Sequence, residues 1–451
     1  MVKKIRFFFC IVLYSTVGWS QSSILDKYIE EGLQNNLSLK SNDLDIKIQQ
    51  SVISQTKKLW NPNVDLNGSY LLATGGRTIV FPVGDLFNPT YATLNQLTGT
   101  QQFPTDLENF ESQLTPNNFL DVQFNGAKPL INSAIKYNQK IQNEILLIQE
   151  LNKEITYQDI TFQIKTAYYN YLKSFKGIAT LEESLKTLNE ILKFNKVLVK
   201  YSKATDDAIS DVDYRIANLE SQKVGITEQQ ILAKALLNLL VNRPLDDDVN
   251  IDTNILLFFS PLEKELLDLK EEALVDRTEI KQLGISDKIN TLNQSRIKKE
   301  GNPELNVFAG IGIQTEEFNF DGGAPLYTTG LSMSMNIIDG GLRKKKIEQL
   351  KFERERIDND KARLNQKIEI EITQNYYQIK SIESQIQSAE SAVRSTQKSY
   401  NILKTKYEND KILLIELLQA QNRLTSSQLN LDILKFDHLI KLAELNKLLG
   451  K

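Results

Sequence analysis

Two different periodicities meet in "YTTGLSMSMNIIDGGLRKKK", Tyr327–Lys346. Apolar and polar residues alternate over 327–337, which predicts a β-strand with one apolar and one polar face. Residues 342–449 contain neither glycine nor proline, as a long helix requires. The sequence therefore predicts a joint between a strand and a helix within this stretch.

Three residues form the predicted strand-to-helix joint: Asp339, Gly340 and Gly341. We expect the glycines to supply a tight backbone bend and Asp339 to cap the helix that follows. The spacing GxxxxGK[ST] is missing, which excludes a phosphate-binding loop of that kind. If the strand before it spans a membrane, the basic run Arg343–Lys346 would lie near lipid headgroups. The alternative is an ordinary solvated first turn of the helix.

Four segments of about ten residues share the alternating pattern of a membrane-spanning β-strand. They are residues 63–73, 119–130, 303–314 and 326–338. A half-buried sheet of a water-soluble protein would give the same pattern and is the alternative. Four strands cannot close a barrel in lipid, because their edges would leave backbone groups unpaired, so several chains would have to contribute to one barrel. The smallest common barrels have eight strands, so a dimer or a trimer is the minimal answer, and twelve strands from three chains would leave a lumen.

Long helical tracts separate these strands. The tract from Asn132 to Tyr201 holds about 70 residues and would extend roughly 105 Å as one helix. In the later tract Ile379, Ile382 and Ile386 recur at three- and four-residue steps, which is typical of a coiled-coil seam. These helices predict an elongated structure.

The chain contains two related halves. Aligning "EGLQNNLSLK" with "EALVDRTEIK" sets Leu39 against Ile280, and the same offset sets Pro62 on Pro303. After the strands a second, shorter offset aligns the rest of each half. It pairs Asn132 with Asp339, Tyr168 with Tyr376 and Asn238 with Asn446.

The two halves predict the domain organisation. Residues 21–249 form the first structural repeat and residues 250–451 the second, each with a helix, two strands, a long helix and another helix. The first repeat carries an extra segment, 73–118, between its strands. Loops of this length are usually functional excursions.

Residues 1–20 read as a signal peptide, with a charged start and a short apolar run before Gln21. Its removal takes away three basic residues and the only cysteine, and leaves a net charge of about −6. This acidic balance argues against nucleic acid as a partner. The lone His438 has no cysteine or second histidine beside it for a zinc site. The sequence predicts no enzyme, no cofactor and no metal site.

Several short motifs, in their order and duplication, carry a family resemblance. They are "NNLSLK", "WNP", "GNP", "NIIDGG", "YENDKILLIELLQAQNRL" and "AELNKLLG". Over the whole mature chain the sequence resembles TolC-like outer-membrane efflux proteins. The resemblance implies an α+β membrane protein: a homotrimer with a β-barrel of four strands per chain, twelve in all, in outer-membrane lipid. It also implies a long α-helical coiled-coil barrel in the periplasm, fed by an inner-membrane transporter through a periplasmic adaptor protein.

The resemblance also implies site residues. Tyr407 matches the family's gate tyrosine, and Glu416 matches the first acidic position of the channel constriction. The second acidic position is Gln419, which would halve the charge of the ring, and the gate arginine is replaced by Ile412. The rest of the predicted constriction is Asp211 and Tyr214. The predicted adaptor-contacting helix tips are Lys203, Asp206, Asp207, Asn409 and Asp410.

Glu416 also has a physical reading of its own. Three copies on a threefold axis would raise one another's proton affinity and attract polyvalent cations. A solvated helix face is the alternative for this carboxylate.

Two functions remain open at this point. The first is an outer-membrane channel in a Gram-negative cell, a passive duct of a tripartite efflux or type I secretion system. The second is a soluble periplasmic coiled-coil adaptor or scaffold, although adaptors usually have one helical hairpin and this chain has two equivalent halves.

Overall fold

The computed structural model describes residues 24–451 apart from positions 116, 252–259 and 322. The predicted signal peptide, 1–20, lies outside the described residues. The helices are α1 Ile24–Asn35, α2 Leu37–Lys58, α3 Val83–Thr98, α4 Ser133–Lys200, α5 Asp206–Leu240, α6 Leu266–Asp276, α7 Thr278–Lys299, α8 Leu342–Glu408 and α9 Leu414–Leu448. The strands are β1 Asn63–Leu71, β2 Thr78–Phe81, β3 Phe110–Gln113, β4 Phe119–Ile131, β5 Glu304–Glu316 and β6 Pro325–Ser334.

The chain divides into two compact units, and each unit draws on both predicted repeats. The helical unit comprises the described residues up to Ile48, Leu146–Asp287 and Glu355–Lys451. The strand unit comprises Gln49–Ile145 and Lys288–Arg354. Within the described residues, no helix has both the length and the apolar character needed to cross a membrane.

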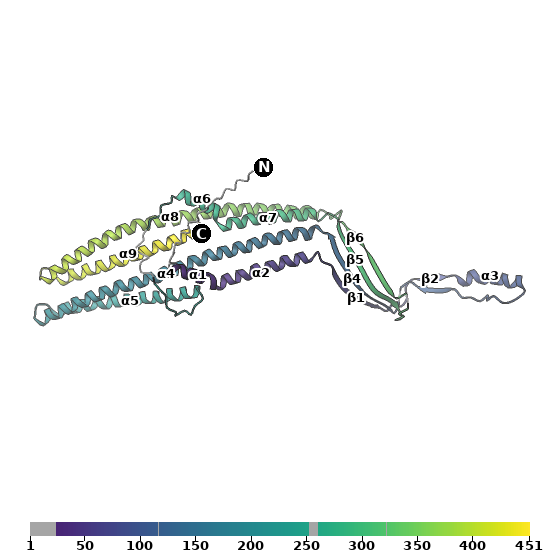
Figure 1. Cartoon of the computed structure of the whole chain (residues 1–451), viewed down its shortest axis with the longest axis horizontal. Coiled ribbons are helices and arrows are strands. Elements are labelled where there is room, and N and C mark those ends of the chain that lie inside the picture. The colour runs from purple at the N-terminus through teal and green to yellow at the C-terminus, as the bar shows by residue number, and fades with distance from the viewer. Residues whose placement is uncertain (1–23, 116, 252–259, 322) are drawn as a thin grey trace, which may run out of the picture. The chain divides into compact units, whose positions relative to one another are not determined.

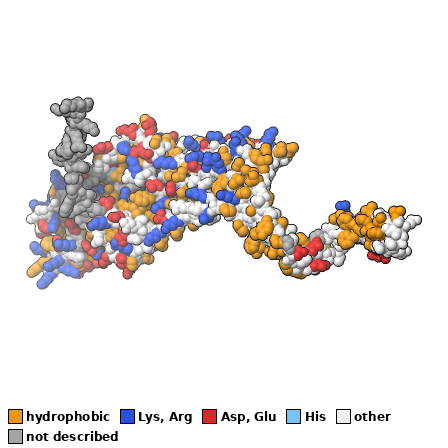
Figure 2. Space-filling model, turned by 45° about the vertical axis from the view of Figure 1, so that its right-hand side comes forward, with side chains coloured by type: hydrophobic (Ala, Val, Ile, Leu, Met, Phe, Trp, Pro, Cys, Tyr) orange, Lys and Arg blue, Asp and Glu red, His pale blue; other side chains and the backbone are white. Residues whose placement is uncertain are grey.

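The strand unit contains an antiparallel sheet in the order β1-β4-β5-β6 (Figure 1). Its register aligns Leu66, Phe124, Ile311 and Tyr327 in one row across all four strands. These four side chains are 59%, 53%, 53% and 74% exposed. The sheet therefore presents an uncovered apolar face, and Figure 2 shows hydrophobic side chains gathered over this part of the chain.

The opposite face of the sheet is mainly polar. The next row aligns Asp65 with Asn125, Gly310 and Thr328. Because successive side chains of a strand point to opposite faces, this face also carries Asn63, Asn67 and Gln123, together with the apolar Phe308 and Leu326.

The strands differ slightly from the predicted ranges. The last was expected over 326–338, but β6 ends at Ser334, which pairs with Glu304. The residue before Glu304 is Pro303, which has no backbone N–H to donate. The β5–β6 ladder therefore ends there, and the alternating residues beyond Ser334 lie outside it.

The segment 73–118, whose residues show no clear periodicity, contains regular structure. Strands β2 and β3 pair from Thr78–Gln113 to Phe81–Phe110, and α3 follows β2. The helix is held to the returning chain by two asparagine side chains. Asn88 exchanges two bonds with the Leu107 backbone, at 2.9 and 2.8 Å. Asn95 does the same with Phe103, at 2.7 and 3.0 Å.

The helical unit is stabilised by buried apolar seams between helices. One core cluster joins α1, α4 and α5 through Tyr28, Ile164, Tyr168 and Leu237. Another includes the fully buried Ile368, Ile372 and Ile379 of α8 together with residues of α6 and α9. Burial of such side chains contributes about 1.5–3 kcal/mol each.

Each repeat begins with two helices where the sequence predicted one. Asn36 separates α1 from α2, and its side chain accepts a bond from the Ser38 amide at 2.9 Å, as an N-cap does. At the matching place in the second repeat, Arg277 lies in an extended conformation between α6 and α7. Neither break is evident in the sequence, because the apolar pattern continues across both.

Candidate functional site

The two helix tips have the same backbone geometry. Ser202, after α4, and Asp410, after α8, have φ angles of 54° and 57°. In each turn the next amide, of Lys203 or Lys411, donates at 2.9 Å to a carbonyl five residues back. An aspartate tolerates this left-handed conformation better than most side chains. That explains how Asp410 can occupy this turn.

All five predicted tip residues are exposed: Lys203, Asp206, Asp207, Asn409 and Asp410. Asp206 and Asp207 lie in the first turn of α5, where the helix dipole favours negative charge. The two tips together form an accessible polar surface.

Tyr407, the predicted gate residue, is buried within one chain. Its hydroxyl donates to the Asn195 side chain at 2.6 Å, and its ring meets Phe194 edge-on at 5.9 Å. Burial raises the pKa of the Tyr407 phenol. The residue therefore ties α8 to α4.

The predicted constriction residues are all exposed: Asp211, Tyr214, Glu416 and Gln419. Glu416 accepts a bond from the Leu413 amide at 3.3 Å and so helps to cap α9. Tyr214 lines a cavity of about 300 Å³ with Leu418 and Gln421. The structure thus brings Tyr214 of α5 beside α9, whereas neither Asp211 nor Glu416 lines this cavity.

The predicted joint has the backbone that its glycines permit. Gly340 and Gly341 have φ angles of 61° and 84°, which L-residues rarely adopt. Asp339 accepts bonds from the amides of Gly341 at 3.1 Å and Arg343 at 3.0 Å. The Arg343 guanidinium also donates to Asp339 at 2.6 Å and holds the pKa of that carboxyl below its usual range. Asp339 therefore caps α8 from outside the glycine pair.

A buried polar cluster in the second repeat was not predicted from the sequence. Glu383 accepts a bond from the Leu262 amide at 2.6 Å and contacts His438 at 3.4 Å. Lys380 donates to the Leu262 carbonyl at 2.6 Å and contacts Glu383 at 3.1 Å. A signal was present, because Glu383 occupies a place in the seam of Ile379, Ile386 and their neighbours where an apolar residue is expected. The cluster fixes the chain entering α6 onto α8.

The lone histidine lies within this cluster. His438 is 1% exposed and packs against Glu383. Among the residues that the structure describes, no group of three or more His, Cys, Asp or Glu side chains could hold a metal ion.

Comparison with known proteins gives one family match. Residues 297–451 match the family model described as outer membrane efflux protein. No curated protein matches the chain.

Solved structures share the fold over nearly the whole chain. VceC of Vibrio cholerae has a TM-score of 0.70 at 16% identity, covering 94% of this chain and 96% of its own. The Campylobacter jejuni CmeC channel has a TM-score of 0.70 at 13% identity, covering 95% and 86%. The open state of the Neisseria gonorrhoeae MtrE channel has a TM-score of 0.72 at 16% identity, covering 94% and 88%.

These neighbours are described as outer-membrane proteins and channels, none of them as an enzyme. The family model therefore confirms the resemblance to outer-membrane efflux proteins over residues 297–451, and the solved structures show the fold of TolC-like channels over nearly the whole chain.

Proposed function

We propose that this chain is one protomer of a trimeric outer-membrane duct that passively conducts substrates from the periplasm to the exterior. The observation that carries the proposal is the uncovered apolar row of Leu66, Phe124, Ile311 and Tyr327 on a four-stranded sheet with a mainly polar opposite face. Lipid is the solvent that accepts such a face.

The edges of the sheet support the association of copies. In the part of the chain that the structure describes, β1 pairs only with β4 and β6 pairs only with β5. An unpaired strand edge is not tolerated in lipid, so β6 of one copy has to pair with β1 of the next. Three copies close a twelve-stranded barrel with a lumen, and the helices of the three copies form a coiled-coil barrel in the periplasm.

The family match supports the setting of the duct. The matched family consists of outer membrane efflux proteins, and CmeC and MtrE are described as outer membrane channels. The proposed partners are a periplasmic adaptor and an inner-membrane transporter of a Gram-negative tripartite efflux or type I secretion system. The exposed tips at Lys203, Asp206, Asp207, Asn409 and Asp410 would meet the adaptor.

The periplasmic entrance is assigned by the same proposal to Glu416, Gln419, Asp211 and Tyr214. Exposure of all four side chains in one chain supports a place on a lumen. Tyr407 would act at the gate through its bond to Asn195, because opening the tip requires α8 and α4 to separate there.

Conductance tests the duct itself. The purified protein should migrate as a trimer in mild detergent and conduct ions in planar bilayers. A water-soluble monomer without conductance would refute the proposal. Labelling of segment 73–118 on intact cells separates the duct from a periplasmic adaptor, since only a duct exposes this segment to the exterior.

The entrance is tested by Glu416→Gln. We expect the variant to weaken block by polyvalent cations added on the periplasmic side, because a ring of three carboxylates attracts them. Glu408→Gln, which removes an exposed charge from the end of α8, is the matched control. Equal block of conductance by polyvalent cations in both variants would exclude a ring of Glu416 carboxylates at the entrance.

A further inference from the structure

The helical unit contains a polar cavity of about 470 Å³ among α4, α7, α8 and α9. This volume is in the range of small-molecule sites and far above the space of one water molecule. The proposed duct gives it no role.

The innermost polar group of the cavity is Asn375. Its side chain is 2% exposed, and neither Nδ2 nor Oδ1 has a hydrogen-bond partner among the described residues. Buried amides are almost always hydrogen-bonded, because an unpaired donor or acceptor loses its hydrogen bond to water and gains none in return. The Asn375 side chain therefore indicates that the cavity holds a molecule that can both donate and accept hydrogen bonds.

The charges around Asn375 are already paired. Arg277 contacts Glu279 at 3.0 Å and Glu371 at 2.5 Å, and Lys447 contacts Asp159 at 2.6 Å. An entering ion would meet balanced charges and would have to break one of these pairs. The lining thus favours a neutral ligand over an anion or a cation.

The rest of the lining combines amides with an apolar wall. Gln374 and Gln378 of α8 lie on the same side as Asn375, whereas Ile155 and Phe162 come from α4. A sugar ring has hydroxyl groups at its edge and a C–H face. One hydroxyl can donate to Oδ1 and another can accept from Nδ2 of the same amide.

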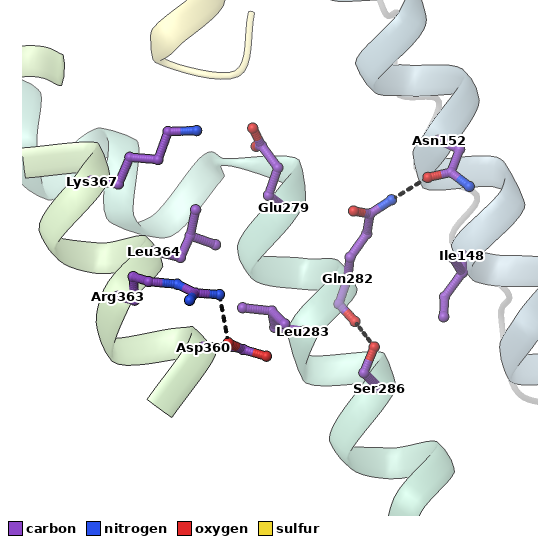
Figure 3. A pocket seen from close by; sticks show the side chains of 10 residues that line it. All are labelled: Ile148, Asn152, Glu279, Gln282, Leu283, Ser286, Asp360, Arg363, Leu364 and Lys367. Atoms are coloured by element: carbon purple, nitrogen blue, oxygen red, sulfur yellow. Dashed lines mark hydrogen bonds and ion pairs between the residues drawn. The ribbon is translucent and has the colours of Figure 1, made fainter. Parts of the chain in front are cut away.

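A neighbouring pocket borders this cavity. It has a volume of about 530 Å³ and shares Glu279 and Lys367 with the polar cavity. Figure 3 shows these two side chains at one end of the pocket, with Gln282 bonded to Asn152 at 2.6 Å across it.

The first repeat has no such amide. The residue that aligns with Asn375 is Ala167, which is fully buried in an apolar cluster. The amide is thus no requirement of the helical plan, since the same plan is completed with alanine.

We propose that this cavity, centred on Asn375, is a binding site for a neutral, hydroxyl-bearing molecule of sugar size. Asn375 makes the directional hydrogen bonds, Gln378 contacts the ligand at the rim, and Phe162 faces the ring. The site is independent of conduction through the lumen.

Saturation-transfer NMR of sucrose tests the site, with the full-length protein in a detergent that carries no sugar headgroup. We expect transfer to the sucrose ring protons, and an affinity about tenfold weaker in Asn375→Leu, which keeps the shape but removes both hydrogen-bonding atoms. Gln378→Ala, at the exposed rim, should weaken binding to a smaller degree. Sodium sulfate and arginine should not compete.

Tyr400→Phe is the matched control. It removes another buried polar atom, the Tyr400 hydroxyl, which has no hydrogen-bond partner among the described residues and lies outside the cavity, and it should leave sucrose binding unchanged. Absence of transfer with the folded wild type, as for a cavity filled by water alone, would overturn the proposal. Equal binding by wild type and both cavity variants would overturn it as well.

Discussion

The two repeats share one helical plan but differ in what they bury. In the first repeat, Ala167 and Leu172 of α4 lie in an apolar cluster. The aligned residues in α8 are Asn375, which is buried, and the partly exposed Lys380, which contacts Glu383. The shared helical plan therefore requires only helices of the right length with matching apolar seams. In the second repeat, Lys380 and Glu383 hold the backbone of Leu262 in place through hydrogen bonds.

The largest difference in stability between matching substitutions is expected at the breaks between α1 and α2 and between α6 and α7. The Arg277 side chain is 10% exposed and pairs with Glu279 and Glu371, whereas the aligned Asn36 makes neutral bonds. Arg277→Leu should lower the free energy of unfolding by about 3 kcal/mol, because two partly buried carboxylates lose their partner. Asn36→Ala should cost about 1–2 kcal/mol. Thermal unfolding followed by circular dichroism measures both, and equal losses would contradict the contrast.

The strand-to-helix joints provide the second comparison. Asn132 caps α4 directly, through the Ile135 amide at 3.0 Å, whereas α8 is preceded by two glycines with positive φ. Gly341→Ala should cost about 1–2 kcal/mol, since a Cβ strains the left-handed conformation. Ser133→Ala, in the first turn of α4, should change stability by less than about 0.5 kcal/mol. A Gly341→Ala protein as stable as Ser133→Ala would show that the joint needs no left-handed residue.

The tips provide the third comparison. Only the second repeat has a tyrosine three residues before the left-handed residue of its tip. Tyr407→Phe keeps the ring and removes the bond to Asn195, which should cost about 1 kcal/mol. Tyr201→Phe alters an exposed ring at the first tip and should have no effect on unfolding. If the two variants have the same melting temperature, the hydrogen bond from Tyr407 to Asn195 contributes nothing to stability.

The smallest expected effect is the pH dependence of the polar cluster. Burial lowers the pKa of His438 below its ordinary 6.5, against the opposing influence of Glu383. Burial raises the pKa of Glu383, but bonds from Leu262, Lys380 and His438 outweigh it and leave the pKa below 4.5. Both groups have depressed values in the folded state, so both stabilise the fold at neutral pH.

That stability should be lost as the pH falls, first below about 6.5 as His438 is forced to protonate and further below about 4.5 as Glu383 is neutralised. His438→Gln introduces the residue that the first repeat has at the aligned position, Gln230. Its melting temperature should fall less between pH 7 and pH 5.5 than that of the wild type. An identical pH profile would exclude His438 as the titrating group.

Much of the fold was predictable because it rests on local periodicity. The alternation around Tyr327 predicts the strands, and the absence of Gly and Pro after Leu342 predicts the long helix. Features that depend on distant partners were not predictable in this way. The bond between Glu383 and the Leu262 amide has no local signature, and neither does the pairing of Tyr407 with Asn195. The constriction and tip residues come from the resemblance and stay predictions, because their role depends on neighbouring copies.

The hairpin of β2, α3 and β3 has a consequence for the history of the chain. It is closed by its own bonds through Asn88 and Asn95, and the register of β1 with β4 runs unbroken from Asn63 to Leu71 below it. The second repeat connects β5 to β6 with only residues 317–324. An ancestral gene could therefore have doubled first and acquired this self-contained insertion later, in one copy alone, without any change in the pairing of its strands.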